Sequence, residues 1–146
     1  MQPTSSRPSG GAFSQIYRVY YADTDAGGIV YHSRYLEFAE RSRAEMLRQI
    51  GHPLVGPAGE QFVARAAALS WQRPARLDDL ITCETSVMHA RGASIRIRHA
   101  FFRQAEPLVE IQIDLVHINS AMRPTRVPDA LRARLAPFLE SPEPGA

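Results

Sequence analysis

Residues 17–43 read YRVYYADTDAGGIVYHSRYLEFAERSR, and this stretch carries most of the information on fold and chemistry. Two carboxylates, Asp23 and Asp25, stand beside a Gly-Gly turn, and His32 follows seven residues after Asp25. A helical pattern begins directly after His32, so Asp25 belongs to a loop that leads into a helix N-terminus. Such a helix end offers free backbone N–H groups and a partial positive charge, which together suit the oxygen of a carbonyl under attack.

The pattern outward from this loop predicts one strand, one long helix and four further strands. Residues 15–21 are aromatic and β-branched, which is typical of a strand. A helix is expected from Arg34 to Ile50, with Ser33 as its N-cap and Gly51 just beyond its C-terminus. Further strands are expected over 61–72, 80–89, 94–103 and 108–119, with turns at 91–92 and 105–107 and a short closing helix over 128–135.

The short turns between the later strands imply antiparallel neighbours. One sheet with a polar outer face can wrap a helix of about 17 residues, which is roughly 25 Å long. The predicted fold is therefore α+β, an antiparallel five-stranded sheet wrapped around one long central helix. The folded domain is expected over 13–140, between a disordered Ser-, Pro- and Gly-rich tail over 1–12 and a flexible tail over 141–146.

Composition excludes several classes of function. The formal charge of +2 over 146 residues is too small an excess to indicate nucleic-acid binding. Cys83 is the only cysteine, so no internal disulfide is possible, and its apolar surroundings predict a small core residue. No apolar run approaches the roughly 20 residues of a membrane span, and the N-terminus lacks a signal-peptide core. We therefore predict a cytoplasmic protein, with attachment to the surface of the inner membrane as an alternative.

Metal-binding patterns, serine-hydrolase patterns and Gly-rich phosphate loops are absent from the sequence, so neither a metal nor a cofactor is expected. The exposed edges of the predicted sheet favour association, since pairing of edges between subunits removes them. We expect a homodimer or a homotetramer.

The run from Tyr20 to Arg43 resembles the signature of the hot-dog-fold thioesterases. It is most similar to the Tol-Pal-associated acyl-CoA thioesterases, within the 4-hydroxybenzoyl-CoA thioesterase-like group. The resemblance rests on the D-x-D-x-x-G-x-V arrangement from Asp23 and on the E-x-x-R that ends at Arg43. It implies a hot-dog fold, a catalytic acid at Asp25, and an oxyanion donor at the backbone N–H of His32. It also implies an active site at a dimer interface, with coenzyme A bound along the surface.

Arg34 departs from the family pattern, which commonly has an asparagine at this position. Any role that the asparagine side chain has in the family is therefore in doubt for this protein. The candidate catalytic residues are Asp25 and His32, and the candidate substrate-binding residues are Tyr21, Tyr31 and Tyr35. Each has a structural alternative. Asp25 could only form a turn, His32 could contribute its backbone alone, and the tyrosines could be core residues.

Other charged residues are expected to be structural. Asp23 is interpreted as a cap of the loop, and Glu40 is expected to pair with Arg41 or Arg43 on the helix. The arginines within 91–103 are expected to lie on a solvated face of the sheet, with contact to the phosphates of coenzyme A as the functional alternative.

Thioester hydrolysis of an acyl-CoA is the function that these observations favour. A carboxylate would act as base or nucleophile, and coenzyme A would enter only as part of the substrate. An acyl carrier protein is a further candidate partner. Two alternatives stay open: a non-catalytic protein that binds acyl-CoA or a cell-envelope partner, and a hot-dog dehydratase or hydratase.

Overall fold

A computed structural model describes residues 11–140, and most of the predicted tails, 1–10 and 141–146, lies outside the described residues. Five strands and two α-helices follow one another with two short 3-10 turns. In chain order they are β1 (Phe13–Arg18), η1 (Tyr21–Asp23), α1 (Arg34–Gln49), β2 (Gln61–Trp71), β3 (Leu80–Arg91), β4 (Ser94–Arg103), β5 (Glu106–Ile118), α2 (Asp129–Leu135) and η2 (Ala136–Phe138).

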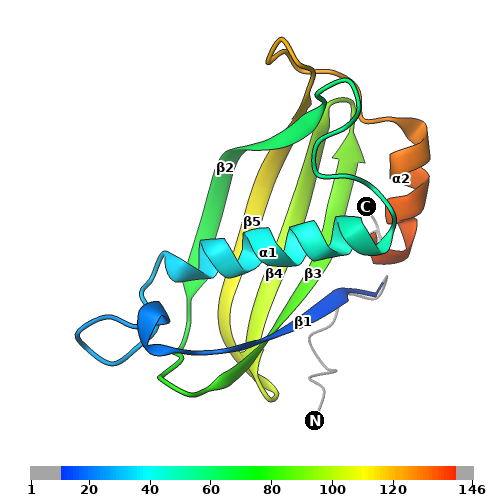
Figure 1. Cartoon of the computed structure of the whole chain (residues 1–146). Helices are drawn as coiled ribbons and strands as arrows, with labels where there is room; N and C mark the ends of the chain where they lie inside the picture. The colour runs from blue at the N-terminus through cyan, green and yellow to red at the C-terminus, as the bar shows by residue number, and fades with distance from the viewer. Residues whose placement is uncertain (1–10, 141–146) are drawn as a thin grey trace.

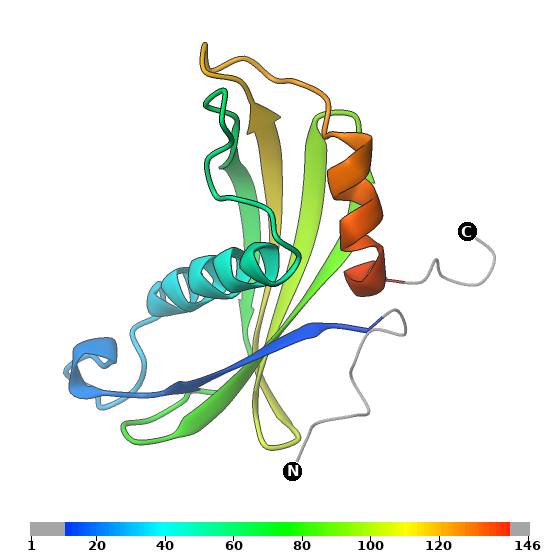
Figure 2. The ribbon, with the colours of Figure 1, turned by 45° about the vertical axis from the view of Figure 1, so that its right-hand side comes forward.

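The strands form one antiparallel sheet in the order β1-β3-β4-β5-β2, and α1 crosses one face of it (Figure 1). Neighbours β3, β4 and β5 are joined by short turns, whereas β1 and β2 pair with one strand each and form the two edges. Figure 2 shows that α1 and the loop after it lie on the same side of the sheet. The predicted α+β fold, with five antiparallel strands around one long helix, is confirmed.

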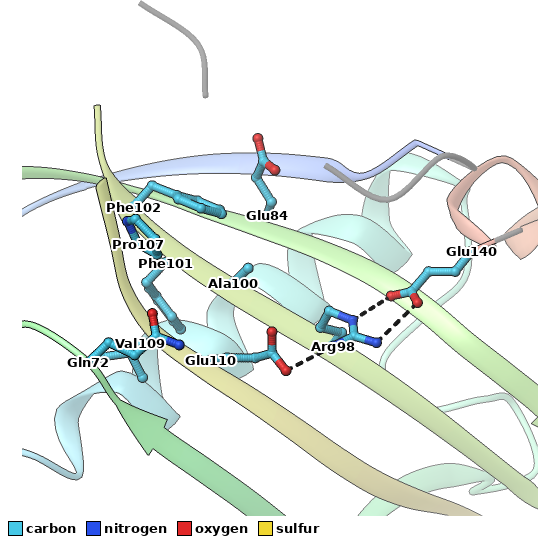
Figure 3. A pocket seen from close by; sticks show the side chains of 10 residues that line it. All are labelled: Gln72, Glu84, Arg98, Ala100, Phe101, Phe102, Pro107, Val109, Glu110 and Glu140. Atoms are coloured by element: carbon cyan, nitrogen blue, oxygen red, sulfur yellow. Dashed lines mark hydrogen bonds and ion pairs between the residues drawn. The ribbon is translucent and has the colours of Figure 1, made fainter. Parts of the chain in front are cut away.

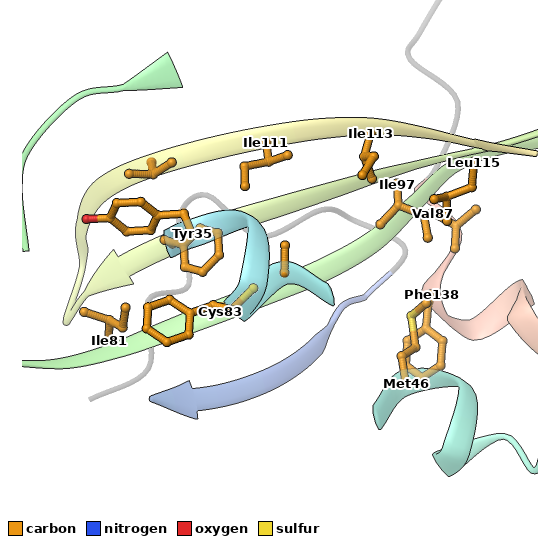
Figure 4. Packing of buried hydrophobic residues seen from close by; sticks show 14 of the residues in the cluster. Tyr35, Met46, Ile81, Cys83, Val87, Ile97, Ile111, Ile113, Leu115 and Phe138 are labelled. Atoms are coloured by element: carbon orange, nitrogen blue, oxygen red, sulfur yellow. The ribbon is translucent and has the colours of Figure 1, made fainter. Parts of the chain in front are cut away.

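The core lies between α1 and the sheet. The helix buries Tyr35, Phe38 and Met46, spaced three and eight residues apart, so they fall on one face. They meet the inward residues of the strands (Figure 4), where every second residue of β4 is buried from Ile95 to Phe101. Truncating a side chain such as Phe38 to alanine in a core of this kind typically costs about 3–5 kcal/mol.

Several local predictions need correction. Residues from Tyr21 form the 3-10 turn η1 instead of continuing β1, because Asp23 folds its carboxylate back onto the backbone. Ser33 stands at the N-cap of α1, but its side chain makes no capping hydrogen bond. Pro107 lies inside β5 instead of in the preceding turn, which is made around Gln104 with a φ of 56°. Among residues 11–140, no helix is long and apolar enough to cross a membrane.

Candidate active site

The loop around Asp25 is a tight turn that presents this carboxylate to solvent. The backbone N–H of Gly28 donates to the carbonyl of Asp25 at 3.0 Å, and Gly28 has a φ of 80°, which favours glycine. Asp25 Oδ1 accepts the N–H of Gly27 at 2.8 Å, and a Cβ added at Gly27 would approach that oxygen to 3.2 Å. Within residues 11–140, Asp25 Oδ2 accepts no hydrogen bond. One carboxylate oxygen is therefore fixed and the other is available for chemistry.

Backbone bonds hold this turn in place. Val30 N–H donates to Ala75 carbonyl at 2.9 Å, and Tyr31 N–H donates to Asp23 carbonyl at 2.9 Å. Asp23 Oδ2 also accepts the N–H of Tyr20 at 2.9 Å, so its side chain closes η1. The interpretation of Asp23 as a structural cap is confirmed, and the two neighbouring carboxylates have different surroundings.

Arg34 ties the first turn of α1 to the loop. Its Nη2 donates to Ala22 carbonyl at 2.7 Å, its Nη1 donates to Glu37 Oε1 at 2.6 Å, and its Nε lies 3.5 Å from Asp23 Oδ1. The arginine therefore bridges the loop and the helix across twelve residues of sequence. We infer that it acts as a positioning residue for the segment that carries Asp25.

The start of α1 is also fastened to the end of β2. Trp71 Nε1 donates to the backbone carbonyl of His32 at 3.0 Å, and the two rings meet edge to face at 6.1 Å. Within the described part of the chain, the backbone N–H groups of His32 and Ser33 donate no hydrogen bond. These two donors stand at the positive end of the α1 dipole.

Asp25 and the helix start open into one hollow of about 380 Å³. Of the predicted site residues, the structure brings Asp25, His32 and Tyr35 together in its wall. The ring of Tyr31 contacts that of His32 in a tilted arrangement, with ring centroids 4.4 Å apart, but Tyr31 lies outside the wall. Tyr21 lines a separate hollow beside η1.

Tyr35 is the most buried of the three tyrosines, with 2% of its surface exposed. Its hydroxyl accepts the N–H of Ala75 at 3.4 Å, and its ring packs edge to face against Phe101. Burial raises the pKa of Tyr35 above its ordinary value, so the phenol is neutral and serves as a rigid wall of the hollow.

The prediction of site residues missed the far wall of the hollow, which comes from the end of β2. That wall consists of Trp71, Gln72, Arg73 and Pro74. The sequence placed these residues at a strand end and the turn after it, but gave no sign of which loop they face. Only Trp71 carried a signal, as the single tryptophan of the chain.

Arg96 and Arg98 do not line this hollow, whereas Arg103 donates to the carbonyl of Pro74 in its wall at 3.3 Å. Arg98 projects from the face of the sheet opposite α1 and is held between Glu110 and Glu140, each at 2.8 Å (Figure 3). Arg96 pairs with Asp114 at 2.6 Å on the same face. The interpretation of this cluster as a solvated sheet face is confirmed for these two arginines, and the structure adds their ion pairs.

No group of three or more His, Cys, Asp or Glu side chains among residues 11–140 is arranged to hold a metal ion. The arrangement at Asp25 instead combines a free carboxylate oxygen, free backbone donors and a partly apolar wall. Chemically, such a hollow suits the addition of a nucleophile to a carbonyl group.

Comparison with known proteins identifies the family of the chain. Residues 19–135 match the thioesterase-like superfamily. The chain is 38% identical over 125 residues to the acyl-CoA thioesterase YbgC of Haemophilus influenzae, covering 83% of this chain and 92% of that protein. It is 36% identical over 120 residues to the acyl-CoA thioester hydrolase YbgC of Escherichia coli O157:H7, covering 80% and 90%.

Solved structures show the same architecture. A crystal structure of a probable thioesterase from Bartonella henselae superposes with a TM-score of 0.76 at 35% identity, covering 80% of this chain and 99% of that chain. A 1,4-dihydroxy-2-naphthoyl-CoA thioesterase from Synechocystis superposes with a TM-score of 0.78 at 18% identity, covering 86% and 96%. At that identity the second likeness concerns the fold alone.

Proposed function

The chain belongs to the thioesterase-like superfamily, and from that premise we propose that it hydrolyses acyl-coenzyme A thioesters at Asp25. One observation carries the proposal. Asp25, with a carboxylate oxygen that accepts no hydrogen bond within residues 11–140, and His32, whose backbone N–H donates none there, line the same hollow. A base or nucleophile and an oxyanion site are the two parts that acyl transfer needs.

The helix start would hold the thioester carbonyl oxygen. Backbone N–H groups of His32 and Ser33 would donate to this oxygen, and the α1 dipole would stabilise the negative charge that develops on it. Removing one such donor typically lowers turnover by about 100- to 1000-fold. In this proposal the imidazole of His32 is secondary to its backbone.

Asp25 would then supply the attack by one of two routes. As a general base, its Oδ2 takes a proton from water while the water oxygen bonds to the carbonyl carbon. As a nucleophile, Oδ2 bonds to that carbon itself and gives an anhydride that water hydrolyses. In both routes the C–S bond breaks, coenzyme A leaves as thiolate, and the products are the free acid and coenzyme A.

A homodimer through β2 would complete the site. β2 is an edge strand of eleven residues, and Ala64 to Ala68 are all exposed in its middle. Identical edge strands that pair antiparallel are related by a two-fold axis perpendicular to the sheet, so both α1 helices stay on one face. If Gln61–Trp71 pairs along its full length, Ala66 faces its own copy and Trp71 faces Gln61 of the partner subunit.

This pairing has a consequence for the site. Trp71 lines the hollow of Asp25, whereas Gln61 lines a larger cavity beside the second half of α1. In the proposed dimer, the carboxylate hollow of one subunit therefore opens beside the larger cavity of the other. Each active site would be shared between two chains.

A panel of acyl-CoA thioesters, with release of free thiol followed by a chromogenic reagent, tests the activity. We expect thiol release that depends on enzyme concentration for at least one acyl class. Hydration of an enoyl-CoA without thiol release would instead identify the dehydratase alternative, and tight binding without turnover would identify the non-catalytic one.

Light scattering tests the dimer, and Ala66→Asp provides the variant. At micromolar concentration we expect the mass of a dimer or a multiple of it. Ala66→Asp would place two carboxylates opposite each other at the two-fold axis, so we expect a monomer with reduced turnover. A monomeric wild-type protein that is fully active would contradict the shared site.

A further inference from the structure

A second and larger cavity, of about 410 Å³, lies between α1, the loop after it and the inner face of the sheet. Most of its wall is aliphatic or aromatic. Representative wall residues are Leu47, Leu54, Phe62, Ile95, Leu115 and Leu135. At about 30 Å³ for a water-sized group, the cavity has room for roughly a dozen non-hydrogen atoms.

Arg43 brings a positive charge into this apolar wall. Its Nη1 lies 3.2 Å from Nε2 of His99, which is fully buried on β4. A guanidinium only donates hydrogen bonds, so Nε2 must accept and the proton of the neutral imidazole sits on Nδ1. That Nδ1 donates to Thr85 Oγ1 at 2.9 Å, which fixes the orientation of the ring.

Burial and the charge of Arg43 keep the pKa of His99 well below its ordinary value, so the ring stays neutral. His99 therefore orients Arg43 without neutralising it. Burial lowers the pKa of Arg43 and the charge of Glu40 opposes this shift, yet Arg43 forms no ion pair within residues 11–140. The expected pairing of Glu40 with Arg43 is thus present as a charge interaction, without an ion-pair contact among the described residues.

Three arginines of the sheet are ion-paired instead. Arg96, Arg98 and Arg103 each pair with at least one carboxylate at 2.6–2.8 Å on exposed or half-buried surface. A half-buried guanidinium held by a neutral partner in an apolar cavity is costly unless an anion reaches it. Glu40 lines the same cavity and its charge acts on Arg43, but the two side chains form no ion pair among the described residues. The geometry therefore leaves the guanidinium open to direct contact with the carboxylate of a ligand.

We propose that this cavity binds the acyl group of the substrate, and that Arg43 binds a carboxylate at the far end of that group. The inference rests on the proposed thioesterase function and names its substrate class, the coenzyme A monothioesters of dicarboxylic acids. The thioester would lie at Asp25 of the partner subunit, because the proposed pairing of β2 strands brings the hollow of Asp25 in one subunit beside the larger cavity of the other. Arg43 is the specificity-determining residue, and His99 is a positioning residue that acts through it.

Two substrates of equal chain length test the proposal. Adipoyl-CoA and hexanoyl-CoA both carry six-carbon acyl groups and differ only in a terminal carboxylate or methyl group. We expect wild-type protein to have a kcat/KM about 10- to 100-fold higher for adipoyl-CoA, the range for a charge-assisted hydrogen bond. Arg43→Met keeps much of the side-chain volume and removes the charge, so it should abolish this preference while hydrolysis of hexanoyl-CoA persists.

Two further variants serve as controls. Arg48→Met removes an exposed arginine one turn further along α1, where it pairs with Glu45 at 3.3 Å outside this cavity. Arg48→Met should leave kcat/KM for both adipoyl-CoA and hexanoyl-CoA unchanged. Arg43→Lys keeps a charge and should retain part of the preference for adipoyl-CoA, which also covers the case in which Arg43→Met does not fold.

The outcomes separate this inference from the proposed function. Equal or better hydrolysis of hexanoyl-CoA by wild-type protein, or an equal loss on both substrates in Arg43→Met, would overturn the role of Arg43 while leaving thioesterase activity intact. If no thioester is hydrolysed, the proposed function fails, and calorimetric titration with hexanoate and its neutral amide, hexanamide, then decides. Tighter binding of hexanoate, lost in Arg43→Met, would still support the anion site, and equal binding of the two would refute it.

Discussion

Replacing Asp25 by asparagine separates the charge of this side chain from its shape. Asparagine keeps an Oδ1 that can accept the N–H of Gly27, now at 2.8 Å, so the turn should persist. The amide group takes the place of Oδ2, which is exposed and accepts no hydrogen bond within residues 11–140. We therefore expect the free energy of unfolding to change by no more than about 0.5 kcal/mol.

Turnover should respond much more strongly. Loss of a general base lowers kcat by about 100- to 10,000-fold, which corresponds to about 2.7–5.4 kcal/mol in the activation free energy. The backbone donors at the helix start are untouched, so binding of the substrate carbonyl is retained. The loss should consequently appear in kcat, with little change in KM.

The assay is steady-state thiol release from an acyl-CoA that the wild-type protein hydrolyses, with thermal unfolding as the check on folding. Asp23→Asn is the matched control, because Asp23 lies two residues away and caps the loop by accepting the N–H of Tyr20 at 2.9 Å. Asparagine can still accept this N–H through its Oδ1, so that variant should lose no more than about 1 kcal/mol of stability, from the weakened contact with Arg34, and keep most of its turnover.

Undiminished turnover in folded Asp25→Asn would refute the assignment of Asp25 as base or nucleophile. Equal losses in the Asp23 and Asp25 variants would show that the loop conformation, and not the charge on Asp25, limits the reaction.

Three further predictions concern the helix start and the core. His32→Ala should lower turnover far less than His32→Pro, which lacks the backbone N–H and should lose about 100- to 1000-fold; equal losses in steady-state assays would assign chemistry to the imidazole. Burial raises the pKa of Cys83 to about 12, so the native protein should not react with the chromogenic thiol reagent, whereas denatured protein should titrate one thiol per chain. The pKa of His99 is lowered in the folded state, so at acidic pH the unfolded state binds a proton that the folded state does not. Neutral His99 therefore contributes fully to stability above about pH 6.5, and this contribution falls as the pH drops below that value. Chemical denaturation between pH 5 and 8 should show a shallower acid loss in His99→Gln than in wild-type protein.

Much of the fold could be predicted because the periodic signals are local. Alternation of inward and outward residues in β4 depends only on the pleat of the strand, and the buried stripe of α1 depends only on the helical turn. The observed boundaries of the elements differ from the predicted ones where a side chain accepts a backbone hydrogen bond or where a strand accommodates a proline. Asp23 turned the end of the predicted first strand into η1, and Pro107 entered β5 next to a register shift at Phe101 and Phe102.

Half of the candidate site was predicted in the same way. Asp25 and His32 are joined by one short loop, so their common hollow is a local consequence of the sequence between them. Trp71 comes from another element, and its hydrogen bond to His32 spans 39 residues. The periodicity of a strand predicts which of its residues are buried, but it does not predict which loop lies against the end of the strand.

The sequence by itself determined the five strands and the two α-helices, the turn that carries Asp25 and the family, because these depend on neighbouring residues. Tertiary structure alone decided which charges are balanced. Arg98 and Arg43 look alike in the sequence, yet the fold places the first between Glu110 of β5 and Glu140 beyond η2, and the second against neutral His99, 56 residues away. The physical reason is that the energy of a charge depends on the dielectric and on the partners around it, and both are set by the packing of elements that are distant in the sequence.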